Sequence, residues 1–233
     1  MSKQTDLINI PDSITVSGSN VGIGTNSPVG KLSIKGTTAS NENSHVTFEN
    51  TQGSKVFAIG GGKSGITNNG FSIINITDNN APLHIDNSGR VTKPNQPSFS
   101  AKGSTQQTIS NNGSDVVIEY PTVEWNIGNS YNNSTYIFTA PVAGKYFFKA
   151  WFMLNGGATS WSYSFLRFVV NNTTSNSEYM HNPRASAYMT MQGSVILDLA
   201  VGDYVSVKTR NASGNSDFTI RNDFRGFQGH LIG

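Results

Sequence analysis

The sequence predicts an all-β protein in two parts: an N-terminal β-rich fibrous shaft, then an antiparallel β-sandwich of the jelly-roll kind. Three observations predict this. Apolar runs of strand length recur along the chain and end in Gly, Asn, Ser or Asp, which favour turns. No apolar residues recur at helical spacing. Of 24 aromatic residues, three precede Pro97 and 21 follow it, so the second part has far more material for a core.

The N-terminal part, residues 20–97, is a series of short runs separated by turns. Its aromatic residues are Phe48, Phe57 and Phe71. With so few bulky groups, a single chain of this length would be marginally stable, and sharing the core between chains, as intertwined fibre shafts do, is the simplest remedy. Two prolines in residues 92–97 disfavour helix and central strand and mark the boundary. Before Pro97, the expected strands are 13–16, 31–34, 45–48, 55–59, 71–76 and 83–85.

The stretch NVGIGTNSP, residues 20–28, places Gly22 and Gly24 near the start of the chain and invites a nucleotide-binding interpretation. The third glycine of the dinucleotide fingerprint is missing, and no helical pattern follows. Pro28 and Gly30 instead predict another turn before a strand. These glycines are therefore expected to shape turns.

The C-terminal part, residues 98–233, has longer and more aromatic strands. About eight to ten strands with turn signals between them indicate an antiparallel sandwich or jelly roll. The clearest candidates are 116–120, 135–139, 145–154, 163–170, 187–199, 204–209, 218–221 and 224–232.

The run KYFFKAWFML, residues 145–154, carries apolar side chains on both faces. One face is formed by alternate residues from Tyr146 to Leu154, and the other holds Phe147, Trp151 and Met153, beside Lys145 and Lys149. A sandwich strand normally buries one face and exposes the other. The second apolar face favours burial of Phe147, Trp151 and Met153 against another subunit, over the alternative of a central strand covered by a loop of its own chain.

Composition and charge argue against several classes of function. The formal net charge is +2 and no basic stripe occurs, so a nucleic-acid partner is not expected. The chain has no cysteine, which excludes disulfides and thiolate zinc sites. The N-terminal residues lack the apolar core of a signal peptide, and no run is long enough to span a membrane, so membrane insertion is not expected.

The residues give no indication of an active site. A glycosidase needs two carboxylates facing one cleft, and the acidic residues here occur singly. His45, His84, His181 and His230 lack the spacing of metal ligands. We therefore expect no enzymatic activity and no cofactor, and metal ligands are left unassigned.

NVGIGTNSP followed by the strand KLSI resembles a phrase that recurs in the shafts of phage tail fibres and related trimeric adhesins. LHIDNSGRVTKP, residues 83–94, resembles the phrase that often leads from shaft to head. The resemblance implies a structural role for these glycines.

The second part resembles the globular head of complement subcomponent q. The residues that carry the resemblance are WNIGNSY (125–131), YIFTAPVAGKYFF (136–148), LDLAVGDYV (197–205) and FQGHLI (227–232). This resemblance implies a jelly roll like that of tumour necrosis factor, assembled as a compact homotrimer. Some relatives bind Ca²⁺ near the trimer axis, but the resemblance places no such site on particular residues here.

Two loops have the composition of binding surfaces. The loop 155–161 ends in Trp161, and the loop 177–184 contains Tyr179, His181 and Arg184. Such side chains combine flat area with hydrogen-bonding groups and suit carbohydrate or protein surfaces, although Trp161 and Tyr179 could instead pack onto the sandwich. Trp161, Tyr179, His181 and Arg184 are the candidate receptor-binding residues.

Together these features predict a homotrimeric virion fibre, assembled in the host cytoplasm: a phage tail fibre whose head attaches to a host surface glycan or protein. Residues 1–19 would dock onto tail or capsid proteins, an assignment that rests on their position alone. The nearest alternative is a capsid or neck fibre with a structural or decoration role. More distant alternatives are a glycan depolymerase and a bacterial surface adhesin.

Overall fold

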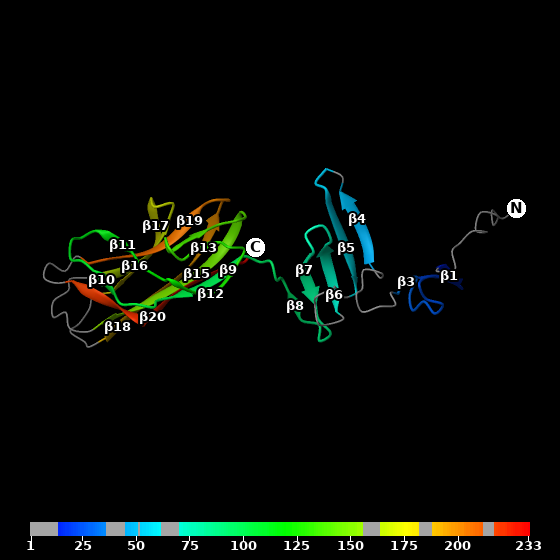
Figure 1. Ribbon diagram of the computed structural model, residues 1–233, viewed down its shortest axis with the longest axis horizontal. Coiled ribbons are helices and arrows are strands. Elements are labelled where there is room, and N and C mark those ends of the chain that lie inside the picture. The colour runs from blue at the N-terminus through cyan, green and yellow to red at the C-terminus, as the bar shows by residue number, and fades with distance from the viewer. Residues whose placement is uncertain are drawn as a thin grey trace. The chain divides into compact units, whose positions relative to one another are not determined.

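The structure is a computed structural model of the whole chain. It describes residues 14–35, 45–50, 52–61, 70–155, 164–181, 188–211 and 217–233; for 45, 50 and 174–181 it describes the backbone alone. Strands and turns make up these residues, with no helix among them, so the chain is all-β as the sequence predicts. The chain divides into two compact units, residues 1–95 and 96–233 (Figure 1).

A small three-stranded sheet forms the first described part of unit 1. Strand β1 (Ile14–Ser17) pairs antiparallel with β2 (Asn20–Ile23), and β3 (Leu32–Ile34) runs parallel to β2. Gly24 begins the connection at φ +70°, and a Cβ there would lie 2.3 Å from the carbonyl oxygen of Lys35. Only glycine fits such a position without strain. Gly24 thus shapes a turn that leads into another strand, as expected. Gly22, expected in a turn, instead lies within β2, where it pairs with Thr15 and Ser33.

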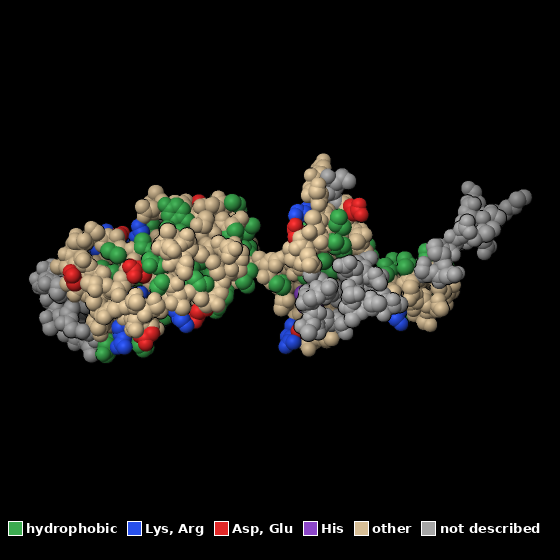
Figure 2. Space-filling view, in the orientation of Figure 1, with side chains coloured by type: hydrophobic (Ala, Val, Ile, Leu, Met, Phe, Trp, Pro, Cys, Tyr) green, Lys and Arg blue, Asp and Glu red, His purple; other side chains and the backbone are tan. Residues whose placement is uncertain are grey.

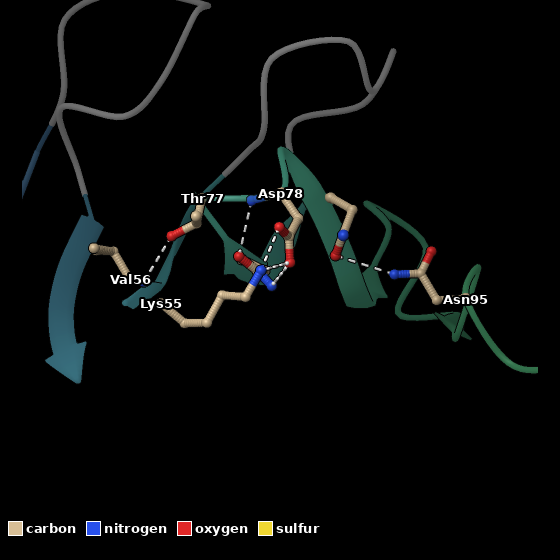
Figure 3. A network of polar contacts seen from close by, with 7 residues as sticks. Lys55, Val56, Thr77, Asp78 and Asn95 are labelled. Atoms are coloured by element: carbon tan, nitrogen blue, oxygen red, sulfur yellow. Dashed lines mark hydrogen bonds and ion pairs between the residues drawn. The ribbon is translucent and has the colours of Figure 1, made fainter. Parts of the chain in front are cut away.

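The second sheet of unit 1 is a five-stranded antiparallel meander in the order β4-β5-β6-β7-β8. The Lys55 ammonium lies 2.5 Å from the Asp78 carboxylate, and the Thr77 hydroxyl accepts a hydrogen bond from the Val56 amide at 2.9 Å (Figure 3). These contacts tie the start of β5 to the turn after β6. The strands are β4 (His45–Asn50), β5 (Lys55–Gly61), β6 (Phe71–Asn75), β7 (Asn80–Ile85) and β8 (Val91–Thr92).

Unit 2 is a sandwich of two antiparallel sheets. The first sheet has the order β12-β9-β20-β15-β18, and β10 also pairs with β20; its strands are β9 (Ser98–Lys102), β10 (Gln107–Ile109), β12 (Thr122–Ile127), β15 (Gly144–Asn155), β18 (Tyr188–Leu199) and β20 (Phe218–Leu231). The second has the order β13-β14-β19-β16-β17, and β11 also pairs with β19; its strands are β11 (Asp115–Val117), β13 (Tyr131–Asn132), β14 (Ile137–Thr139), β16 (Ser164–Val170), β17 (Thr174–His181) and β19 (Tyr204–Arg210).

Aromatic side chains fill the space between the two sheets. Phe99 stacks on Tyr131 with ring centroids 4.7 Å apart, and Phe138 meets Phe148 edge-on at 5.1 Å. All four are buried, and each such pair contributes about 0.5–1.5 kcal/mol beyond its burial. The excess of aromatic residues after Pro97 therefore builds a core that belongs to unit 2 alone.

Several strand assignments differ from those expected. The strands β2, β8, β9, β10, β12 and β13 were not among the expected ones, and two further differences concern β20 and β17. The runs 218–221 and 224–232 belong to one strand, β20, because a register shift between its pairs with Phe152 and Leu154 absorbs the intervening residues. Residues 177–181, expected in a loop, belong to β17, which pairs with β16 along its whole length. Sequence patterns miss β17 because a polar edge strand carries little apolar alternation.

Candidate functional site

The central strand β15 exposes a second apolar face on the outer side of the first sheet. Its inner residues Tyr146, Phe148 and Phe152 are fully buried in the core. On the outer side, Phe147, Trp151 and Met153 are half-buried, so the strand has no fully solvated face. β15 pairs with β18 on one side and β20 on the other, which fixes the direction of all three outer side chains.

The neighbouring strands continue this face. Phe147 lies opposite His230 of β20 and Ile196 of β18 in the strand registers. The rings of Phe147 and His230 have centroids 5.4 Å apart, and Ile196 is 61% exposed. An exposed aliphatic side chain in mid-strand, next to an aromatic pair, is typical of a surface that a partner covers.

The Trp151 ring packs over a position of β20 that is free of a side chain because the residue there is glycine. The partner of Trp151 in β20 is Gly226, and a Cβ on Gly226 would lie 2.2 Å from Cζ2 of the Trp151 ring. The ring therefore lies flat against the β20 backbone. The Lys149 ammonium lies 5.7 Å from the centre of the Trp151 ring, within the range of a cation–π contact.

Polar groups border the apolar residues toward β12. Glu124 accepts hydrogen bonds from the Lys102 ammonium at 2.9 Å and the Ser100 hydroxyl at 2.8 Å. The hydrogen bond from Lys102, and then that from Ser100, lowers the pKa of Glu124. A register shift between Val123 and Trp125 in β12 leaves Trp125 about half exposed beside them. An apolar centre with a satisfied polar border matches the usual anatomy of a protein interface.

We call this surface the β15 face: Phe147, Trp151 and Met153 of β15, with Ile196 and His230 from the neighbouring strands β18 and β20. Trp125 extends it on β12, which β9 and β20 separate from β15 in the sheet. A hollow of about 350 Å³ lined by Lys149, Gln192, Gly193 and Ser194 opens between β15 and β18. The apolar centre of the face suits association, and the Glu124 carboxylate at its border is held by Lys102 and Ser100.

The structure places the three residues expected at a subunit contact on one face, whereas the side chains of the expected receptor-binding residues lie outside what it describes. Trp161 and Arg184 lie outside the described residues. Tyr179 and His181 lie on β17, whose backbone alone is described. Within the described part of the chain, no three His, Asp or Glu side chains are grouped as metal ligands, and the Ca²⁺ site considered above stays unplaced.

Sequence reasoning did not single out Ile196, Trp125 or His230 for this face. On the outer side of β18, Ile196 stands between the polar residues Ser194 and Asp198, so its position looks ordinary until the register places it beside Phe147. Trp125 reaches the outer side through a register shift that no sequence pattern signals. A useful signal would have been Ile196 in SVILDL. Alternation places it on the opposite face from Leu197 and Leu199, which β18 buries in the core, so a large aliphatic residue stands on the outer face.

Residues 98–232, more than half of the chain, match the sequence profile of the C1q domain. The chain belongs to the C1q domain family. Domains of this family and of the related tumour-necrosis-factor fold are generally trimeric. A comparison with curated protein sequences gave no match. Among the described residues, no helix is long and apolar enough to cross a membrane.

Solved structures with a similar jelly roll come from several animals. The globular domain of zebrafish complement 1qA has 18% identity and a TM-score of 0.45, covering 59% of this chain and 98% of its own. Eiger TNF from S. frugiperda has 10% identity and a TM-score of 0.46, covering 59% of this chain and 93% of its own. Murine APRIL has 11% identity and a TM-score of 0.46, covering 59% of this chain and 99% of its own.

Proposed function

We propose that this C1q-domain protein is a homotrimeric virion fibre whose head attaches a phage to its host surface. The observation that carries the proposal is the β15 face, an apolar surface at the centre of a sheet in a family of generally trimeric domains. Three copies of this face, packed together, would bury Phe147, Trp151 and Ile196 away from water. At about 25 cal/mol per Å² of apolar area, such burial is a substantial driving force.

Unit 1 supports the shaft in this proposal. One face of its five-stranded sheet is apolar and uncovered, with the Lys55–Asp78 ion pair at one end. We call this the unit 1 apolar face; its members are Val46, Phe48, Phe57, Ile59, Phe71, Ile73, Leu83, Ile85 and Val91. Phe48 is 55% exposed, and Figure 2 shows hydrophobic side chains on the surface of this unit. In a trimer, this face would meet its equivalents.

The charged side chains of the head favour a binding protein over an enzyme. Asp115 is paired with Arg167 and Arg210, and Asp203 accepts hydrogen bonds from Asn171 and from the Ala200 amide. Both carboxylates thus hold the fold together. Residues 1–19 would join the fibre to tail or capsid proteins, and most of that segment lies outside the described residues.

Two measurements test this function. Light scattering on the full chain should give three times the chain mass, and a monomer would contradict the fibre. The labelled trimer should then adsorb to the host of the phage that encodes it and compete with virion adsorption. A trimer that does not adsorb, on a chain that antibodies locate to the capsid or neck, would replace the tail-fibre role with the decoration alternative.

A further inference from the structure

A groove of about 460 Å³ opens on the outer face of the second sheet, on the side of the sandwich opposite the β15 face. It lies where two strands share one edge of β19: β14 pairs with Tyr204 and Val205, and β11 pairs with residues from Lys208 to Arg210. Ser206 lies between these two pairings. The volume falls within the range of about 300–1,000 Å³ that is usual for small-ligand sites.

The groove is lined by hydroxyl groups that the protein itself does not use. Thr135, Thr139, Tyr204 and Ser206 contribute side-chain hydroxyls, and none of the four makes a hydrogen bond with another described residue. Ser206 is only 3% exposed, so its hydroxyl is among the most enclosed on this face. Four unused hydroxyls around one groove can exchange hydrogen bonds with a polyhydroxylated ligand.

Apolar groups complete the lining. Ile137 and Val117 present aliphatic surface, and the Tyr204 ring adds a flat one. Ligand sites typically combine such surfaces with a few polar groups that fix orientation. A pyranose ring matches this combination, since it has apolar C–H faces and a rim of hydroxyls.

The charge in the groove favours an acidic ligand. Lys208 is the one Lys, Arg, Asp or Glu among the lining residues, and its ammonium bonds the neutral side-chain oxygen of Asn172. Asp115, two residues along β11 from Val117, the partner of Lys208, is already shared by Arg167 and Arg210 at 3.0 and 2.6 Å. A ligand carboxylate beside Lys208 would therefore gain a charge-assisted hydrogen bond without displacing an ion pair.

The turns around the groove are conformationally restricted. Tyr136 has φ 61° and Asn172 has φ 57°, left-handed conformations that are uncommon for non-glycine residues, although asparagine adopts them more readily than most. The Asn132 side-chain oxygen accepts hydrogen bonds from the amides of Ser134 and Thr135 at 2.8 and 3.1 Å. Positions fixed before binding reduce the entropy lost when a ligand is bound.

We propose that this groove binds an acidic sugar unit, a uronic acid, of a host surface glycan. The assignment of this sugar to a host surface glycan rests on the attachment function proposed above. The preference of the groove for an acidic sugar rests on its lining residues alone. Because the groove and the β15 face lie on opposite sides of the sandwich, burial of the β15 face in a trimer does not by itself cover the groove. Three grooves per fibre would convert weak single contacts into avid attachment. No carboxylate lines the groove, so the sugar would be bound and not hydrolysed.

Isothermal titration of the full chain with two matched sugars tests this inference. The probes are cellotetraose and the tetrasaccharide of β-linked glucuronic acid, which has the same backbone with a carboxylate on each ring. The acidic sugar should bind, and Lys208→Met should raise its Kd about tenfold, as expected for a lost charge-assisted hydrogen bond. Thr139→Val should raise the Kd about threefold to fivefold through loss of one neutral hydrogen bond.

Two matched variants are controls. Lys93→Met removes an exposed ammonium in unit 1, and Thr108→Val removes an exposed hydroxyl on β10; both should leave the Kd unchanged. Equal affinity for both sugars, no binding of the acidic sugar, or no effect of Lys208→Met would overturn the inference. If the chain binds the acidic sugar but adsorbs to no host, the inference about the groove stands and the attachment function is rejected. If the chain adsorbs to its host, Lys208→Met does not change this adsorption and the acidic sugar does not bind, the attachment function stands and the groove inference is rejected.

Discussion

Gly229 lies on the inner side of β20, where it allows two aromatic rings to approach the backbone. A Cβ at this position would lie 2.6 Å from Cδ1 of Phe148 and 2.7 Å from Cε1 of Phe99. Both rings are buried in a close-packed core and have no room to move aside. The residue is therefore fixed by packing, although sequence alone shows it as one more glycine in FQGHLI.

Gly229→Ala should destabilise the head by about 1–3 kcal/mol, the usual cost of overpacking a core. Urea unfolding followed by tryptophan fluorescence would measure the loss. Gly233→Ala is the matched control, because a Cβ at Gly233 meets no atom within 4 Å. Equal midpoints for the two variants would show that the aromatic cluster can rearrange at little cost.

Asp203 makes the stability of the head depend on pH. A hydrogen bond from the Asn171 side chain, and then one from the Ala200 amide, lowers the pKa of Asp203 from its ordinary value of 3.8. A carboxyl with a lowered pKa stabilises the folded state above its unfolded pKa, and this contribution is lost as pH falls through the folded value. The head should therefore lose stability below about pH 4.

Asp203→Asn keeps an acceptor for the Ala200 amide but does not titrate. The variant should show a smaller fall in the urea midpoint between about pH 5 and about pH 2 than the wild-type chain shows. Asp217→Asn is a suitable comparison, since from the described residues the Asp217 carboxylate accepts one hydrogen bond, that of the Asn111 amide. If both variants followed the wild-type curve, the acid sensitivity would arise from other carboxyl groups.

At the scale of elements, strand β15 could be predicted in detail and its surroundings could not. The order of residues in KYFFKAWFML is enough to assign each side chain to the inner or the outer face, because successive side chains of a strand point to opposite sides. The residues that complete the β15 face come from β12, β18 and β20, and only the pairing registers bring Ile196 and His230 beside Phe147. The groove residues were missed for the same reason, since Thr139 and Lys208 become neighbours only through β19 and its two partners.

Ile196→Asp should dissociate the trimer while leaving the head folded. Ile196 is 61% exposed in the single chain, so the substitution costs little in the fold but places a charge in the proposed contact. Val201→Asp is the matched control, because Val201 is 67% exposed in the turn after β18. Light scattering should report a lower molar mass for Ile196→Asp alone. A trimer in both variants would place the subunit contact elsewhere.

At the scale of the whole molecule, the two units bury apolar surface in different ways. Unit 2 closes a core of its own, with Phe99, Phe148 and Phe227 fully enclosed. In the described part of unit 1, the buried apolar residues are Ala58, Ile74 and Ala81, and all three phenylalanines of the unit are exposed. A trimeric head would hold three copies of unit 1 at high effective concentration and so favour their association.

Phe48→Ser combined with Phe71→Ser should therefore loosen unit 1 without disrupting the head. Phe48 and Phe71 are 55% and 44% exposed in the single chain, so their burial, and the stability it gives, would come from neighbouring chains. Limited proteolysis should cut unit 1 faster while the resistant head fragment and its trimeric mass persist. Val29→Ser, at a fully exposed apolar position, should digest like the wild-type chain. Unchanged digestion of the double variant would mean that the unit 1 apolar face stays open in the assembled protein, and the shaft would need another source of stability.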